Sequence, residues 1–246
     1  MKIALACCAV SACLLVATAA AVSSAVSGAV SGGGRQETRP AAAASADRGA
    51  RTYDAKKRTL TSTARPAVRI KHGKDLKYIG TQSFTLYDVA HAEQHFFVDA
   101  DDENRVRRFY WVQFEGYLPT NKNTYNYRSA DAVKMGDFMF VSDARPVHIP
   151  TTKAQQRPDS DGARARAFIE SKGYRMASDD MLWQRLVHMV DASKRDELMI
   201  IYMEDLGASG LVAEDFAEKG KAASLWKDVS AGLRERAAAG LELKKN

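Results

Sequence analysis

The sequence predicts an α+β domain, an antiparallel sheet of about six strands with helices packed on one face. Three observations support this class. Apolar and polar residues alternate in short segments between residues 68 and 143, apolar residues recur with a helical period after residue 158, and one late segment, 197–203, is apolar on both faces. Strands that precede helices in the chain are typical of an antiparallel sheet with segregated helices. We therefore expect the helices to be concentrated in the C-terminal third.

Residues 1–22 predict a signal for export. Lys2 is the only charged residue before Arg35, and residues 3–22 are apolar or small. A short positive start, an apolar core and small residues at a cleavage site, here Ala17-Thr18-Ala19, are typical of a secretory signal peptide. This pattern predicts a periplasmic or extracellular protein.

Two alternatives for the leader stay open. Its apolar run is about 20 residues long, enough to span a bilayer, which is compatible with an uncleaved anchor. Residues 10–13, Val-Ser-Ala-Cys, resemble a lipidation site at Cys13, although the apolar run continues beyond it. A mitochondrial transit peptide is disfavoured, because such peptides are Arg-rich and the first 34 residues contain no Arg. We expect membrane contact only through a retained or lipidated leader.

Cysteine and charge distribution exclude several classes of site. The three cysteines, Cys7, Cys8 and Cys13, all lie in the leader, so the rest of the chain has no disulfide, no cysteine nucleophile and no cysteine-ligated zinc. The formal net charge is +6, but acids interrupt the basic residues along the chain. Because a nucleic-acid site needs a clustered basic face, we expect no nucleic-acid partner.

The chain beyond the leader divides into a spacer and one domain. Residues 23–67 consist mainly of Ala, Ser, Gly, Arg and Thr, which bury too little apolar surface to offset the entropy lost on ordering. We expect a flexible low-complexity linker there. Residues 68–246 then form a single globular α+β domain, and about 180 residues are enough for one sizeable core.

Alternation of side-chain character predicts the strands in order. The segment 68–80 reads as two short strands around a turn, and residues 83–89 and 93–99 alternate again. The longest candidate is RVRRFYWVQFEGY, residues 105–117. Turn-forming residues at 119–123 precede a candidate returning strand at 124–128. Residues 137–143, which follow Gly136, are a further candidate strand.

Helical signals appear later in the chain. Pro158-Asp159-Ser160 predicts a helix start and Lys172-Gly173 a helix stop. A second helix is expected from Ser178, because Leu182, Trp183, Leu186, Val187 and Val190 form one apolar stripe at helical spacing. Residues 197–203, ELMIIYM, predict a central covered strand. Helical segments are expected again at 211–220 and 222–243.

The acidic stretch near Asp99 favours a hairpin turn over a calcium loop. A loop of the EF-hand type needs Gly at its sixth position and Glu at its twelfth. Counting from Asp99 places Asn104 and Tyr110 at those positions, and counting from Asp101 places Arg105 at the fifth. Asp and Asn suit turns, because their side chains bond nearby backbone and tolerate positive φ.

One face of the strand at 105–117 is the candidate ligand site. Period-two alternation places Arg107, Trp111, Gln113 and Glu115 on the same side. Aromatic walls with a few polar groups are typical of small-molecule sites, with Arg107 as an anion contact. Two further aromatic residues from the neighbouring segment are expected as wall, namely Tyr125 and Tyr127. The alternative is a sheet face half covered by a loop.

A second candidate is a divalent-metal site formed by His91, Glu93 and His95. These three residues share a side in an extended segment, and imidazole and carboxylate are ligands for zinc and similar metals. The zincin motif, however, needs Glu directly after the first His, where this chain has Ala92. The alternative is a strand edge with polar groups facing water.

The sequence favours a binding role over catalysis. It contains no Gly-x-Ser-x-Gly, no Walker A loop and no Gly-x-Gly-x-x-Gly. We expect an exported, non-catalytic domain without a cofactor that binds a small apolar molecule or an envelope protein. Two alternatives stay open: a metal-assisted hydrolase using the His91/Glu93/His95 segment, and a structural envelope protein that uses residues 225–243 as its contact.

Overall fold

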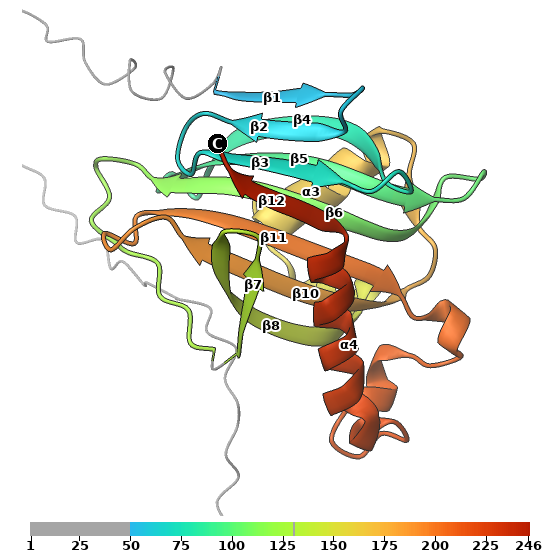
Figure 1. Ribbon diagram of the computed structural model, residues 1–246. Helices are drawn as coiled ribbons and strands as arrows, with labels where there is room; N and C mark the ends of the chain where they lie inside the picture. The colour runs from blue at the N-terminus through green and yellow to red at the C-terminus, as the bar shows by residue number, and fades with distance from the viewer. Residues whose placement is uncertain (1–49, 130) are drawn as a thin grey trace, which may run out of the picture. The chain divides into compact units, whose positions relative to one another are not determined.

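The computed structural model describes residues 50–129 and 131–246, and the predicted leader and most of the predicted linker lie outside these residues. The described chain is dominated by antiparallel sheet, with its helices after residue 148 (Figure 1). The predicted α+β character is confirmed in this coarse form. The larger sheet has eight strands rather than about six.

The larger sheet runs in the order β4-β5-β6-β11-β10-β8-β7, and every pairing along it is antiparallel. The short β9 pairs in parallel with β6. The central strands β6 and β11 are covered on both faces, because alternate residues of each strand belong to two different buried clusters. The bounds of these strands are β4 Lys77–Leu86, β5 Ala90–Ala100, β6 Arg105–Tyr117, β7 Asp131–Met135, β8 Phe138–His148, β9 Arg175–Met176, β10 Asp180–Met189 and β11 Asp196–Asp205.

The smaller sheet corrects the predicted linker. It has the order β1-β2-β3-β12, with bounds Arg51–Asp54, Thr59–Ser62, Val68–His72 and Leu241–Lys245. The first two strands lie inside the stretch predicted to be a linker up to residue 67. This stretch is ordered although it contains few large side chains. Leu60 is fully buried, and β2 pairs with β3 along its length.

The helices are distributed over both faces of the larger sheet, which corrects the prediction of one covered face. The bounds are α2 Ile149–Gln155, α3 Asp161–Ser171 and α4 Trp226–Ala239, with short 3-10 turns η1 Gly207–Ser209, η2 Ala213–Phe216 and η3 Ala223–Leu225. On β6, Tyr110 and Phe114 belong to a core that includes the smaller sheet and α4. Trp111, of the opposite parity, packs with Ile169 of α3.

One predicted helical segment is a strand instead, and a second is helical but ends in a strand. The segment from Ser178 forms β10, whose Leu182 and Leu186 face one core while Met181 and Val187 face the other. An i, i+4 spacing is also an even spacing, so a strand buried on both faces produces the same apolar positions as a helix. The segment 222–243 contains α4, but its last residues turn into β12, which pairs with β3 (Figure 1).

Other local predictions are confirmed. The strand 105–117 has the predicted bounds, and ELMIIYM lies within β11 between β6 and β10. Helix α3 begins after Ser160, whose side-chain oxygen accepts the backbone N–H of Ala163 at 3.2 Å.

Two other local predictions are wrong. The predicted strand at 124–128 is absent, since this described segment has no regular secondary structure, and the predicted helix at 211–220 is reduced to one 3-10 turn.

Candidate functional site

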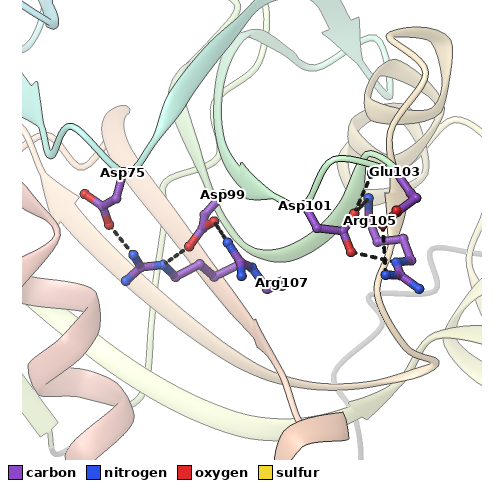
Figure 2. Close-up of polar contacts among 7 residues, drawn as sticks. Asp75, Asp99, Asp101, Glu103, Arg105 and Arg107 are labelled. Atoms are coloured by element: carbon purple, nitrogen blue, oxygen red, sulfur yellow. Dashed lines mark hydrogen bonds and ion pairs between the residues drawn. The ribbon is translucent and has the colours of Figure 1, made fainter.

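The acidic stretch forms the turn of the β5–β6 hairpin, as predicted (Figure 2). Asp101 accepts the backbone N–H of Arg105 at 2.8 Å and its Nε–H at 2.6 Å. Glu103 accepts a further bond from Arg105 at 2.9 Å. One arginine of the same turn therefore offsets part of the charge of these two carboxylates.

Arg107 is not brought together with the other predicted ligand residues. Its side chain is exposed and donates to Asp99 at 2.6 Å (Figure 2). Trp111 lies four residues further along the strand, a rise of about 13 Å. Arg107 and Trp111 do share one face of β6, as predicted. However, Arg107 lies at the exposed end of that face and Trp111 at its buried centre.

The other predicted residues of β6 form one hydrogen-bonded chain. Gln113 is fully buried, and its Oε1 accepts from Trp111 Nε1 at 2.9 Å and from Gln94 Nε2 at 2.7 Å. The Gln113 amide in turn donates to Glu115. Trp111, Gln113 and Glu115 are therefore held in fixed orientation along the strand.

The two predicted wall tyrosines complete this network from a loop. Tyr125 donates its hydroxyl to Glu115 Oε1 at 2.8 Å, and Tyr127 donates to Glu197 Oε1 at 3.0 Å. Glu197 lies on β11 directly opposite Glu115 in the strand register. Its second oxygen, Oε2, is buried and has no hydrogen-bond partner among the described residues.

Burial raises the pKa of three carboxyl groups in this region, those of Glu115, Glu197 and Asp161. Protein atoms surround the Glu115 carboxyl, and this desolvation raises its pKa to about 7. Burial, and then the charge of Glu115, raise the pKa of Glu197 well above its usual range. Burial likewise raises the pKa of Asp161, at the first turn of α3. Near neutral pH the cluster therefore retains protons, because ionising all three side chains would place like charges together.

A groove lies beside this network, between the sheet and the helices α2 and α3. We call it the α3 groove. One part has a volume of about 290 Å³, and a narrower part adds about 80 Å³ between α3 and the sheet. Trp111, Trp183, Arg145, Gln156 and Gly162 line both parts. The apolar residues of the narrow part are Phe109, Val147, Ile149, Ala165, Ile169, Met176 and Met203.

Arginines give the groove its polar character. Arg185 forms a bidentate pair with Asp143, with both bonds at 2.9 Å, and stands 4.9 Å from the centre of the Tyr127 ring. Arg145 lies directly across from Trp183 in the β8–β10 register, and its guanidinium carbon is 4.6 Å from the centre of the Trp183 ring. The groove therefore combines aromatic platforms with cationic groups.

The predicted metal segment is placed on β5, where Glu93 and His95 are buried. His95 Nε2 is 2.8 Å from Glu93 Oε1, and His95 Nδ1 is 3.0 Å from the Tyr78 hydroxyl. Arg51 binds the other oxygen of Glu93 at 3.1 Å. Both imidazole nitrogens and both carboxylate oxygens therefore already have partners.

His91 shares the strand face but lies about 13 Å from His95 along an extended strand. Within residues 50–129 and 131–246, no three His, Cys, Asp or Glu side chains gather in a way that would hold a metal ion. The metal site therefore stays a prediction, and the divalent cation it would hold remains unassigned.

Sequence reasoning missed residues of the network and of the groove because they come from other elements. Glu197 stands at the edge of an apolar run, and Trp183 lies on a segment predicted to be helical. Neither position signals a site by itself. Their proximity to β6 depends on strand order, which a single sequence does not specify.

Comparison of the chain with protein families, with curated proteins and with solved structures finds no match. Among the residues that the structure describes, the helices are all too short or too polar to cross a bilayer. The groove and its chemistry are thus the basis on which a function can be assigned.

Proposed function

We propose that this chain is an exported, non-catalytic binding domain that takes a small apolar molecule into the α3 groove. The observation that carries the proposal is that Trp111 and Trp183 both line both parts of the groove. Ligand sites are typically concave, largely apolar and fitted with a few oriented polar groups. The volume is at the small end for such sites, so the ligand is a small aromatic or acyl molecule.

The rigidity of the groove also supports binding. Trp111 is fixed by its bond to Gln113, and Trp183 is held between two arginines, Arg145 at 4.6 Å and Arg185 at 5.6 Å from its ring centre. A site whose walls are held before the ligand arrives loses little entropy on binding.

A small molecule fits this surface better than an envelope protein. Within the described residues, the large apolar side chains that are exposed occur in four separate segments, as Tyr87, Met139, Val212 and Leu225. A large contiguous apolar patch is one mark of a protein interface. The proposal of export rests on the leader alone, whose single positive residue and apolar run are typical of a signal peptide.

Titration with phenylnaphthylamine, a neutral apolar probe that fluoresces when it leaves water, tests the binding role. We expect saturable binding to the purified protein. Trp183→Ala removes one platform and is expected to weaken binding about tenfold. Trp226→Ala is the matched control, because Trp226 lies on α4 and packs on Phe216 outside the groove.

Either of two results would contradict the proposal. One is the absence of saturable binding by the folded wild-type protein. The other is an equal loss of affinity in both tryptophan variants, since a change outside the groove should leave a groove ligand unaffected. Export is tested separately, by expressing the full chain in a secreting host and sequencing the N-terminus of the mature protein.

A further inference from the structure

Two guanidinium groups that line the α3 groove form no ion pair with the described residues. Arg145 of β8 lines both parts of the groove. It also lines a neighbouring hollow of about 570 Å³ along α2. Its side chain stacks on Trp183 but makes no hydrogen bond or ion pair with any described residue. Arg185, two residues beyond Trp183, differs because Asp143 binds it in bidentate fashion.

A second guanidinium faces the groove from the helical side. Arg166 of α3 lines the narrow part and donates to the side-chain oxygen of Gln156. No carboxylate of the described residues lies within ion-pair distance of it. The sheet wall and the helix wall therefore each present a guanidinium without an anionic partner.

The two acids at the groove are bound by groups other than Arg145 and Arg166. Asp143 is engaged by Arg185. Asp161 accepts the backbone N–H of Gly162 at 2.7 Å, and burial raises the pKa of its carboxyl. Neither of these acids forms an ion pair with Arg145 or Arg166, so the groove beside the two guanidinium groups attracts anions.

We propose that the ligand of the α3 groove is an apolar molecule with one acidic group, a carboxylate or a sulfonate, and that Arg145 and Arg166 bind that group. This inference rests on the proposed binding function and specifies the class of its ligand. Guanidinium suits the task because its planar donors match the two oxygens of an acidic group. Stacking on Trp183 fixes the plane of Arg145 while its outer N–H groups stay free.

Two probes with the same ring skeleton separate charge recognition from apolar binding. Phenylnaphthylamine is neutral, and anilinonaphthalene sulfonate carries one anionic group. We expect the wild-type protein to bind the sulfonate at least about tenfold more tightly than the neutral probe. Arg145→Gln should remove most of this preference, because it should weaken binding of the sulfonate by a larger factor than binding of the neutral probe.

Arg145→Lys and Arg107→Gln are the matched variants. The lysine keeps the charge but loses the planar donors, so an intermediate preference for the sulfonate is expected. Arg107 is an exposed arginine of the same sheet that pairs with Asp99, and its removal should leave both affinities unchanged. Circular dichroism and the thermal midpoint confirm that each variant is folded.

The outcomes distinguish the two proposals. Equal wild-type affinity for both probes would overturn the inference about the acidic group and leave the binding function standing. An equal loss of both probes in Arg145→Gln would also overturn it, because the arginine would then act only on the shape of the groove. Failure of both probes to bind the folded wild-type protein would contradict the binding function itself.

Discussion

Glu115 on β6 lies directly opposite Glu197 on β11, at the centre of the larger sheet. Each carboxyl group accepts one tyrosine hydroxyl, from Tyr125 and Tyr127 respectively. Like charges directly across a strand pair are destabilising, more so away from water. The pair is therefore tolerated only while at least one of the two groups is protonated.

The first prediction concerns the stability of this pair as a function of pH. The folded chain holds the Glu115 proton up to about pH 7, against an ordinary pKa of 4.5, so it binds more protons than the unfolded chain between these values. Stabilisation from this group is full below pH 4.5 and is lost as the pH rises through about 7. Glu197→Gln removes one charge and keeps an oxygen for Tyr127, so it should raise the free energy of unfolding above pH 7 by about 1–3 kcal/mol.

Thermal unfolding followed from pH 5 to 9, roughly the range over which these groups titrate, measures this effect. Glu103→Gln, in the exposed turn, is the control and should change stability by less than about 0.5 kcal/mol. The interpretation would be wrong if Glu197→Gln and the wild-type protein showed parallel pH profiles.

The second prediction concerns the hydroxyl of Tyr127. It is the partner of Glu197 Oε1, and the other oxygen of that carboxyl has none among the described residues. Tyr127→Phe should therefore lower the free energy of unfolding by about 1–3 kcal/mol, the cost of leaving a buried acceptor unpaired. Tyr87→Phe is the comparison, because Tyr87 is exposed and keeps its contact with Arg157 as a phenyl ring. Urea denaturation of both variants gives the values, and equal stability would refute the assigned bond.

The third prediction separates a structural role of His95 from metal binding. Burial lowers the pKa of His95, so the folded chain favours its neutral form and this stabilisation is lost as the pH falls below the ordinary value of 6.5. His95→Ala breaks contacts to Glu93 and Tyr78 and should lower the thermal midpoint, whereas His91→Ala should not.

Metal content, measured on protein purified without chelator, completes the comparison. If His91, Glu93 and His95 hold a divalent metal, the wild-type protein should contain it stoichiometrically and both alanine variants should lose it. A metal-free wild type with a selective loss of stability in His95→Ala would instead support a purely structural network.

The fourth prediction concerns the C-terminal strand. Leu243 of β12 is buried at 1% exposure and pairs with Ile70 of β3. Leu243→Ala should lower the free energy of unfolding by about 2–4 kcal/mol. Glu242→Ala, on the exposed side of the same strand, should have little effect. Deletion of residues 221–246 would remove β12 and is therefore expected to unfold the smaller sheet. Loss of partner binding after such a deletion would not by itself show that residues 225–243 form the contact.

Local patterns explain which parts of the fold were predictable. The strand at 105–117 shows period-two alternation over its full length, and α3 has a serine cap and a glycine stop. Both signals act within a few residues, so they survive in any tertiary context. The segment at 180–189 lacked such a signal, because a strand buried on both faces carries apolar residues at helical spacing as well.

The candidate site divides in the same way. The sequence alone determined that Trp111, Gln113 and Glu115 share one face, because side chains of a strand alternate. Only the tertiary structure placed Glu197 opposite Glu115 and Arg145 opposite Trp183, since strand order and register depend on contacts between distant segments. It also separated Arg107 from its neighbours on the same face, because burial is decided by what packs above a strand and not by the strand itself.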